Sequence, residues 1–283
     1  MNADSEYNLI DSGDGMKLER FGQYVLARPD PQILWHRALT PAIWNNADAR
    51  FVRKDGNAKW LRSPKLPKSW PMQFFGLTFL VRPTTFKHTG VFPEQYENWV
   101  WLDRIVRNSK RKDIKVLNLF GYTGGATLTL LRAGAEVCHV DASKTSLEWA
   151  RENAVLSGLA DRPVRWILDD AKAFVKREIK RGKKYDGIVM DPPAFGHGPK
   201  GDVWKLEENL SELLELCREL LSDKPLFFVV NGYASHFSHI TYRQLLEQSL
   251  KLSHGVYESG ELVLSETDMR RVLVAGIYAR WSC

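Results

Sequence analysis

From Ile114 onward, short apolar runs alternate with amphipathic segments, and this alternation constrains the fold more than any other feature of the chain. Runs of this length and composition are typical of strands buried on both faces of a sheet. Strands that alternate with helices form a parallel sheet with right-handed crossovers. The sequence therefore predicts an α/β domain with a Rossmann-like sheet over residues 113–283. The expected strands are 115–120, 136–140, 164–168, 185–190 and 226–230.

The segments between these runs carry helical patterns, and the end of the chain returns to strand patterns. Two strands at the end, 256–264 and 271–278, are expected to form an antiparallel pair. The expected helices are 125–133, 143–157, 170–181, 207–221 and 241–252.

The first 85 residues differ from this pattern, because their apolar segments are short and prolines are frequent. They predict a small β-rich module, with turns at 13–15 and 55–57. A connecting segment, 86–112, is expected to hold a helix from after Pro93 to about Asn108.

The composition is that of a globular protein without a membrane segment or a secretory leader. Its three cysteines, Cys138, Cys217 and Cys283, are far apart and predict neither disulfides nor a metal site. A cytoplasmic location is expected. Nothing in the sequence indicates the oligomeric state.

The net charge of +6 arises entirely from the first 113 residues, which hold 18 basic and 12 acidic side chains. The segment 50–68 contributes seven basic residues and one acid, with aromatic residues in or just after it: Phe51, Trp60, Trp70, Phe74 and Phe75. Cations mixed with aromatics suit a nucleic-acid backbone with unstacked bases. The alternative is a solvated surface over a small aromatic core, and charge alone leaves both open.

Glycines occupy the turn between the first expected strand and its helix, in Phe120-Gly-Tyr-Thr-Gly-Gly125. Such a turn lets the backbone approach a ligand closely. The spacing of Gly121 and Gly124 differs from the G-x-G-x-x-G pattern that cradles a pyrophosphate. The turn alone is a weak signal, since an ordinary tight turn has the same composition.

Carboxylates after the next two strands strengthen the signal. Asp141 ends the second strand, where an acceptor-only group can bind both hydroxyls of an adenosine ribose. Asp170 follows the third strand and could accept from the adenine amino group, with Asp169 as the competing candidate and one of the two as a helix cap. Together these features indicate S-adenosylmethionine (SAM) rather than NAD. The expected cofactor residues here are Phe120, Gly121, Tyr122, Thr123, Gly124, Asp141, Ala142, Ser143, Asp169, Asp170 and Ala171.

The fourth strand ends in Asp191-Pro-Pro-Ala-Phe195, which is expected to face the methyl acceptor. Two prolines hold the backbone in a rigid array, and Phe195 could stack on a base. Asp191, Pro193 and Phe195 are therefore the candidate catalytic residues, although Asp-Pro-Pro alone also suits a sheet-edge turn. Asn231 and Tyr233 are expected as a second wall. His197 is expected to contact substrate or to be a bystander, because methyl transfer from a sulfonium needs no general base.

The patterns V-L-N-L-F-G-Y-T-G, V-D-A-S, D-A-x-x-F and D-P-P-x-F resemble those of class I SAM-dependent methyltransferases, in particular the branch with the bacterial 23S ribosomal RNA methyltransferases I and K. The resemblance implies a class I methyltransferase sheet, SAM as cofactor and RNA as substrate, contacted through the basic N-terminal module. The segments 9–15 and 28–32 resemble a small β module of this branch. The segment 86–95 resembles one that helps to cover the cofactor, which implies roles there for Lys87 and Gln95.

Two departures from the family pattern bear on the chemistry. Cytosine-C5 enzymes of this branch need a cysteine after the fifth strand, and 230–235 contains none; 191–195 contains none either. Cys138 and Cys217 fit better as buried packing groups, so direct transfer without a cysteine nucleophile is predicted. Ala194 separates the prolines from Phe195, which leaves amine methylation open. A methyltransferase for a small molecule or protein, with the N-terminal module as a lid, and a non-catalytic RNA-binding relative remain the alternatives.

Overall fold

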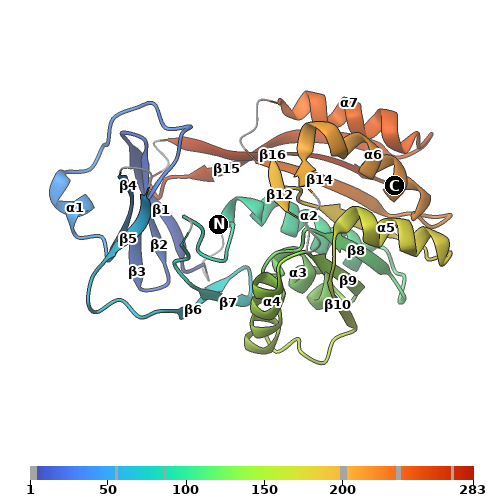
Figure 1. Ribbon diagram of the computed structural model, residues 1–283, viewed down its shortest axis with the longest axis horizontal. Coiled ribbons are helices and arrows are strands. Elements are labelled where there is room, and N and C mark those ends of the chain that lie inside the picture. Colours follow the sequence, from blue (N-terminus) through green and yellow to red (C-terminus); the bar gives the residue numbers. More distant parts are fainter. Residues whose placement is uncertain (1–4, 55–56, 86, 198–202, 234–236, 269–270) are drawn as a thin grey trace. The chain divides into compact units, whose positions relative to one another are not determined.

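The computed structural model describes residues 5–54, 57–85, 87–197, 203–233, 237–268 and 271–283, with the backbone alone at Lys54, Asn57 and His197. The chain forms two compact units (Figure 1). One consists of residues 1–96 and 263–275, and the other of 97–262 and 276–283. Among the described residues, no helix is both long enough and apolar enough to cross a membrane.

The larger unit is built on a seven-stranded sheet, counted over the described residues, in the order β10-β9-β8-β11-β14-β16-β15. The first five of these strands are parallel, and β16 runs antiparallel to β14. This arrangement confirms the predicted α/β fold class. The strands are β8 (Lys115–Leu119), β9 (Glu136–Asp141), β10 (Val164–Leu168), β11 (Gly187–Met190), β14 (Phe227–Tyr233), β15 (Val256–Ser265) and β16 (Val272–Ser282).

Helices cover both faces of this sheet (Figure 1). Residues that alternate along β8 and β9 point to opposite faces. Leu117 and Val140 belong to a core packed with α5, α6 and α7, whereas His139 lies on the face of α3. The helices of the unit are α2 (Tyr96–Asn108), α3 (Gly125–Ala133), α4 (Lys144–Leu156), α5 (Ala171–Lys180), α6 (Leu206–Glu219) and α7 (His239–Leu250).

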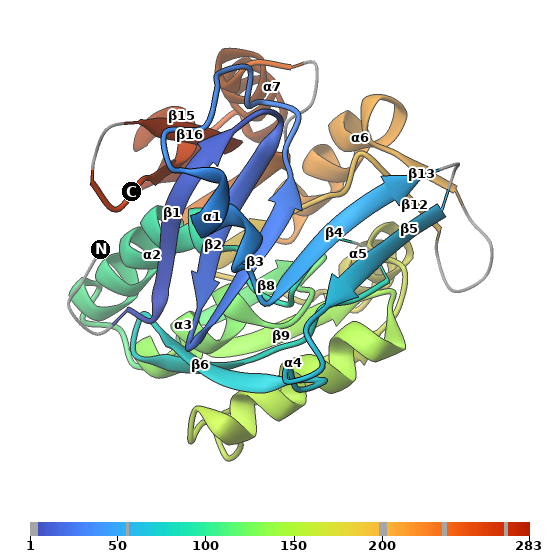
Figure 2. The same ribbon diagram turned by 90° about the vertical axis from the view of Figure 1, so that its left-hand side faces the viewer.

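The smaller unit contains a five-stranded sheet in the order β1-β2-β3-β4-β5, counted over the described residues (Figure 2). This sheet is the predicted β-rich part of the fold. A separate hairpin, two short helical segments and residues 263–275 complete the unit. Its elements are β1 (Tyr7–Gly13), β2 (Met16–Phe21), β3 (Tyr24–Pro29), α1 (Pro41–Asn45), β4 (Ala49–Lys54), β5 (Asn57–Arg62), β6 (Trp70–Phe74), β7 (Leu77–Val81) and η1 (Pro93–Gln95).

The strand pattern of this unit was only partly predictable. The turn at 13–15 joins β1 to β2 as expected, while the turn at 55–57 includes residues outside the described part of the chain. Strands β1, β2 and β6 carry no clear sequence signal. In β2, Glu19 is fully buried, and Arg28 of β3 donates to its carboxylate at 2.7 Å. A buried ion pair of this kind replaces the polar–apolar alternation by which a half-buried strand is recognised.

Candidate active site

All the predicted site residues of the larger unit lie along one edge of its sheet, where the parallel strands have their carboxyl ends. After β8 the chain continues on one side to β9 and β10, and later on the other side to β11 and β14. The crevice at such a switch in strand order is where open α/β sheets bind ligands. The sheet topology therefore predicts that a ligand binds at the loops after β8, β9, β10 and β11.

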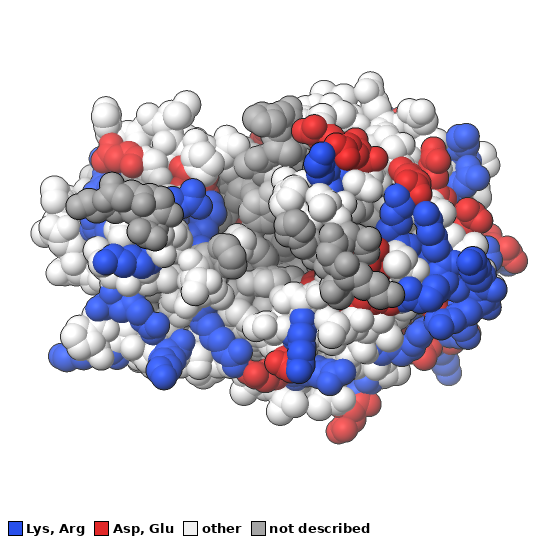
Figure 3. Space-filling view, viewed as in Figure 1, with Lys and Arg blue, Asp and Glu red and all other residues white. Residues whose placement is uncertain are grey.

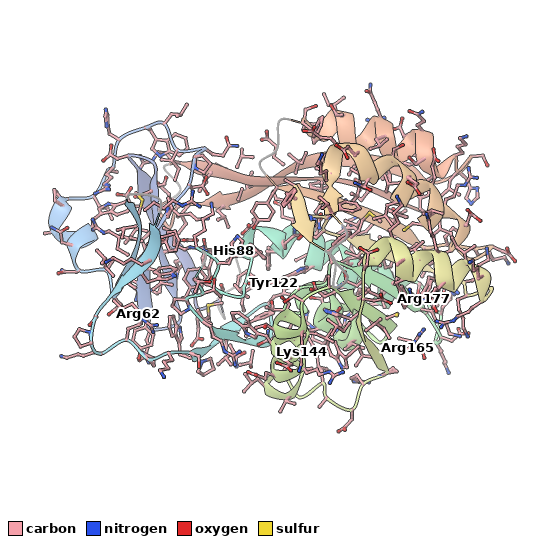
Figure 4. All side chains as sticks on the ribbon, in the orientation of Figure 1. Arg62, His88, Tyr122, Lys144, Arg165 and Arg177 are labelled. Carbon is pink, nitrogen blue, oxygen red and sulfur yellow. The ribbon has the colours of Figure 1, made fainter. Side chains whose placement is uncertain are left out.

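The loop after β8 has an unusual backbone. Phe120 (φ 57°), Tyr122 (φ 47°) and Gly124 (φ 91°) all adopt the left-handed conformation, which residues with a Cβ rarely occupy. Tyr122 is labelled in Figure 4. The loop is held by hydrogen bonds from the Gly121 amide to the Val140 carbonyl at 3.1 Å and from Gly124 to Gly121 at 3.0 Å. Strained backbone held in this way is characteristic of preorganised binding loops.

A buried histidine explains why Gly121 cannot carry a side chain. A Cβ at this position would lie 2.4 Å from Cε1 of His139, well inside van der Waals contact. The His139 ring is fully buried, and burial lowers its pKa to about 3, so the imidazole is neutral. Its Nδ1 lies 2.9 Å from the Thr127 hydroxyl, to which Asn118 donates at 2.8 Å. Sequence reasoning missed His139, whose signal is a polar residue inside the apolar run of β9.

Asp141 can accept more hydrogen bonds than the described part of the chain supplies. One carboxylate oxygen accepts from the Tyr122 amide and the other from the Ser143 amide, both at 2.8 Å. Each oxygen has a second acceptor site. Burial raises the pKa of Asp141 above its usual 3.8, and the two amide bonds oppose this rise. A partly buried carboxylate with two open acceptor sites fits the two hydroxyl donors of the ribose of SAM.

The two aspartates after β10 have different partners. Asp170 caps α5, because its side chain accepts from the Ala173 amide at 2.8 Å. Asp169 accepts from the Asp170 amide at 3.0 Å and forms an ion pair with Arg177. Its amide donates to the Asp141 carbonyl at 3.0 Å, which joins the ends of β9 and β10. Asp170 is thus the helix cap that the sequence expected at one of the two positions, and it has one oxygen engaged in that role.

The segment after β11 presents its aromatic residue to solvent. The Asp191 amide reaches the Leu119 carbonyl at 3.4 Å, which places the backbone of Asp191 beside the end of β8. Phe195 is 56% exposed and begins the short strand β12 (Phe195–His197), which pairs with β13 (Val203–Lys205). An exposed ring of this kind can stack on a base. The side chain of His197 lies outside the described residues.

The predicted second wall is only partly open. Asn231 is 3% exposed, and its carboxamide oxygen accepts from Asn98 of α2 at 2.8 Å. Its side chain points to the α2 face of the sheet, so in this structure it fixes β14 to α2 rather than lining an open surface. Tyr233, at the end of β14, is half-buried.

Lys87 and Gln95 belong to the smaller unit, so their predicted contribution to the cofactor site stays a prediction. Within that unit, the Lys87 ammonium donates to the Pro29 carbonyl at 3.4 Å, and burial lowers its pKa. Gln95 is buried in η1. Ala142, Ser143 and Ala171 lie directly after β9 and at the start of α5, beside the carboxylates already described.

Two of the three cysteines, Cys138 and Cys217, are packing groups, as the sequence predicted. Cys138 in β9 and Cys217 in α6 are buried. Burial raises the pKa of Cys138 to about 11 and also raises that of Cys217. Thiols in this state do not supply a nucleophile at neutral pH.

Comparison with known proteins agrees with this geometry. The family model of S-adenosylmethionine-dependent methyltransferases matches residues 40–232, and the chain belongs to that family. The predicted resemblance, enzyme class and cofactor are thereby confirmed.

Three relatives illustrate the similarity. The ribosomal RNA large subunit methyltransferase I of Escherichia coli O157:H7 is 31% identical over 231 residues, which are 75% of this chain and 54% of that protein. This chain therefore spans about half the length of the curated relatives it matches. A SAM-dependent methyltransferase structure from Agrobacterium tumefaciens is 46% identical, with a TM-score of 0.93 over 98% of this chain and 90% of that one. A Streptococcus mutans structure has a TM-score of 0.76 at 16% identity, covers 99% of this chain and 76% of that one, and shares the fold.

Proposed function

We propose that this protein transfers the methyl group of SAM directly to RNA, with ribosomal RNA as the leading substrate class and the cytoplasm as its location. The observation that carries the proposal is the meeting of two features at one sheet edge. Asp141 keeps two acceptor sites for a ribose at the end of β9, and the segment 191–195 follows β11, on the other side of β8, with Phe195 exposed. The relatives named as ribosomal RNA methyltransferases support RNA as the acceptor.

The residues divide into a cofactor side and an acceptor side. SAM supplies an electrophilic methyl group on a sulfonium, so the protein needs to align the acceptor and exclude competing geometries. The loop 120–124 would fix the position of the cofactor, with Asp141 on the ribose and Asp169 or Asp170 near the adenine. Asp191 and Pro193 would orient the acceptor, Phe195 would stack on it, and Tyr233 and His197 would lie beside it. Lys87 and Gln95 would cover the cofactor.

A cationic surface on the larger unit supports a polyanionic substrate. Lys and Arg atoms gather over α5 and the turn that follows it in Figure 3, and Figure 4 labels Arg165 and Arg177 in this region. Within the described residues, Lys180 and Lys183 form no ion pair and are exposed. Acidic and basic residues are equal in number over residues 114–283, so the net charge of this segment does not reveal the local excess of basic residues. Its basic side chains are Arg165, Lys172, Lys176, Arg177, Lys180, Arg181, Lys183 and Lys184, and the first four and Arg181 form ion pairs with acids.

Three of the five aromatic residues in or just after the basic segment of the smaller unit are buried, whereas Trp60 and Phe75 are half-buried. Phe51, Trp70 and Phe74 are buried, so these rings form the aromatic core that was the alternative interpretation. The register of β4 and β5 places Arg53 and Lys59 on opposite faces of the hairpin. RNA binding by this unit would therefore depend on phosphate contacts, which weaken steeply with added salt.

The test is transfer of labelled methyl from SAM to unmodified ribosomal RNA, followed by nucleoside digestion and mass spectrometry. We expect one methylated nucleoside that disappears with Asp191→Ala and persists with Asp223→Ala, an exposed acid at the opposite sheet edge. A C5-methylpyrimidine would contradict the argument from the cysteines. Measurable SAM binding without transfer to RNA would favour a small-molecule or protein acceptor instead.

A further inference from the structure

Trp204 contacts both halves of the candidate site, although the sequence did not single it out. It lies in β13 and is 7% exposed. Its indole Nε1–H donates to the Pro193 carbonyl at 2.6 Å. Its ring centroid lies 5.1 Å from that of Phe120, with a tilted geometry of 56° between the planes. One side chain thus joins the acceptor segment to the first residue of the strained cofactor loop.

The acceptor segment depends on such contacts because its own backbone has few donors. Pro192 and Pro193 have no N–H, so the backbone of these two residues can form hydrogen bonds only through its carbonyls. Pro193 accepts from Trp204, and Ala194 accepts from the amide of Leu206 at 3.0 Å. Both donors come from β13 and the start of α6. The two strands of this hairpin are three residues each, a length that is not stable without supporting contacts.

We propose that Trp204 is a positioning residue for methyl transfer, which rests on the proposed function. Through its N–H it fixes the carbonyl of Pro193, and through its ring it fixes Phe120, so the acceptor is held at a set distance from the cofactor. A misplacement of about 1 Å can lower the rate of a bound reaction by about 100-fold. Trp204 acts through Pro193 and Phe120 and need not touch either substrate.

The variant that tests this role is Trp204→Phe, which keeps an aromatic ring against Phe120 and removes the N–H donor. Trp281→Phe is a matched control, because Trp281 is also buried and its Nε1–H donates to the His254 carbonyl at 2.8 Å. Trp281 pairs with Phe228 near the beginning of β14, away from the carboxyl ends of the strands. Both variants lose one indole-to-carbonyl hydrogen bond in the same unit.

For Trp204→Phe we expect kcat for methyl transfer to fall about 10- to 100-fold while the Kd for SAM stays within about twofold. Trp281→Phe should leave both constants unchanged, even if the two variants lose similar thermal stability. Equal kcat values for the two variants would overturn the proposal. So would a fall in kcat that is matched by an equal loss of SAM affinity, since that would indicate damage to the cofactor loop.

Hydrogen–deuterium exchange gives a readout that needs no methyl acceptor. In Trp204→Phe the amides of Phe195, Gly196 and Leu206 should exchange about fivefold faster than in the wild type and in Trp281→Phe. Unchanged exchange would overturn the positioning role. If the wild type transfers no methyl to RNA, the proposed function fails, while this measurement still decides whether Trp204 holds the segment.

Discussion

The two edges of the sheet in the larger unit each carry a prominent aspartate, and the two carboxylates are treated differently. At the amino edge, Asp186 is 6% exposed and accepts from the Lys115 amide at 2.9 Å, Ser222 at 2.8 Å and Arg111 at 2.6 Å. At the carboxyl edge, Asp141 is half-buried and accepts from two backbone amides. A cavity of about 660 Å³ opens beside Asp186.

The difference shows how a structural carboxylate is distinguished from a binding one. Asp186 is neutralised by a guanidinium and holds three parts of the chain together. Among the described residues, no cation forms a hydrogen bond with Asp141, and burial raises the pKa of this carboxyl group. A carboxylate whose ionised form is disfavoured by burial gains most from a ligand that supplies hydrogen-bond donors. A cavity is therefore a weaker indication of function than a carboxylate that can accept further hydrogen bonds.

The largest effect should come from Asp141→Ala set against Asp186→Ala. Removal of the Asp141 carboxylate should weaken SAM binding by at least about 100-fold, since hydrogen bonds to a charged group each contribute about 1.5–3 kcal/mol. Asp186→Ala should lower the free energy of unfolding by about 3 kcal/mol, because it leaves Arg111 without its carboxylate, and should preserve the Kd of the folded protein. Calorimetric titration and urea unfolding measure the two quantities. If Asp186→Ala weakens SAM binding as strongly as Asp141→Ala, the distinction between a structural and a binding carboxylate is wrong.

Gly121→Ala should have the next largest effect, on both stability and SAM affinity. The added Cβ collides with the His139 ring, and overpacking of this kind costs about 1–3 kcal/mol. Displacement of the loop should also weaken SAM binding. The double variant Gly121→Ala/His139→Ala should recover part of both losses, because the second change makes room for the methyl group. The single variant His139→Ala is the control, because it removes the ring without adding a Cβ at position 121. If neither stability nor SAM affinity rises in the double variant, the collision with His139 is not the cause of the losses.

The pH dependence of SAM binding should follow Asp141. Its pKa in the free protein lies above 3.8, so affinity for SAM should fall as the pH is lowered through that raised value. In the same window the folded protein binds more protons than the unfolded chain, so the contribution of Asp141 to stability decreases as pH rises from 3.8. Titration of Kd between pH 4 and 8 in wild type and Asp141→Asn measures the effect. A slope that survives in Asp141→Asn would assign it to another group.

The smallest effect, on the pH dependence of stability, should come from Glu178. Like Asp186, this carboxylate accepts several hydrogen bonds from other parts of the chain. It is fully buried and accepts from Tyr185 at 2.6 Å, Arg181 at 3.0 Å and Arg165 at 3.3 Å. Although burial by itself raises its pKa, these hydrogen bonds outweigh it and hold the pKa below the usual 4.5. Its stabilisation is therefore complete above pH 4.5 and is lost as the pH falls through the lowered value, opposite in sign to Asp141. Urea unfolding between pH 3 and 7 should show a shallower acid loss in Glu178→Gln, and identical slopes would contradict this assignment.

Much of the larger unit could be predicted because its signals are local. The helix expected at 125–133 and the strand at 164–168 have those bounds in the structure. The strand expected at 115–120 ends one residue earlier, because Phe120 turns into the left-handed conformation. In the smaller unit, β2 escaped prediction because its buried Lys17 and Glu19 follow no apolar period.

The sequence by itself determined the order of strands and helices, the glycine turn, and the placing of carboxylates after successive strands. These features depend on neighbours in the chain, and they identify the family and its cofactor. Only the tertiary structure decided that Asn231 and Phe51 are buried, and that Trp204 joins the two halves of the site. Burial and hydrogen-bond saturation depend on distant partners: Asp186 is saturated by Arg111 and Ser222, 75 and 36 residues away in the chain. No local pattern records such partners, because only the folded sheet brings them together.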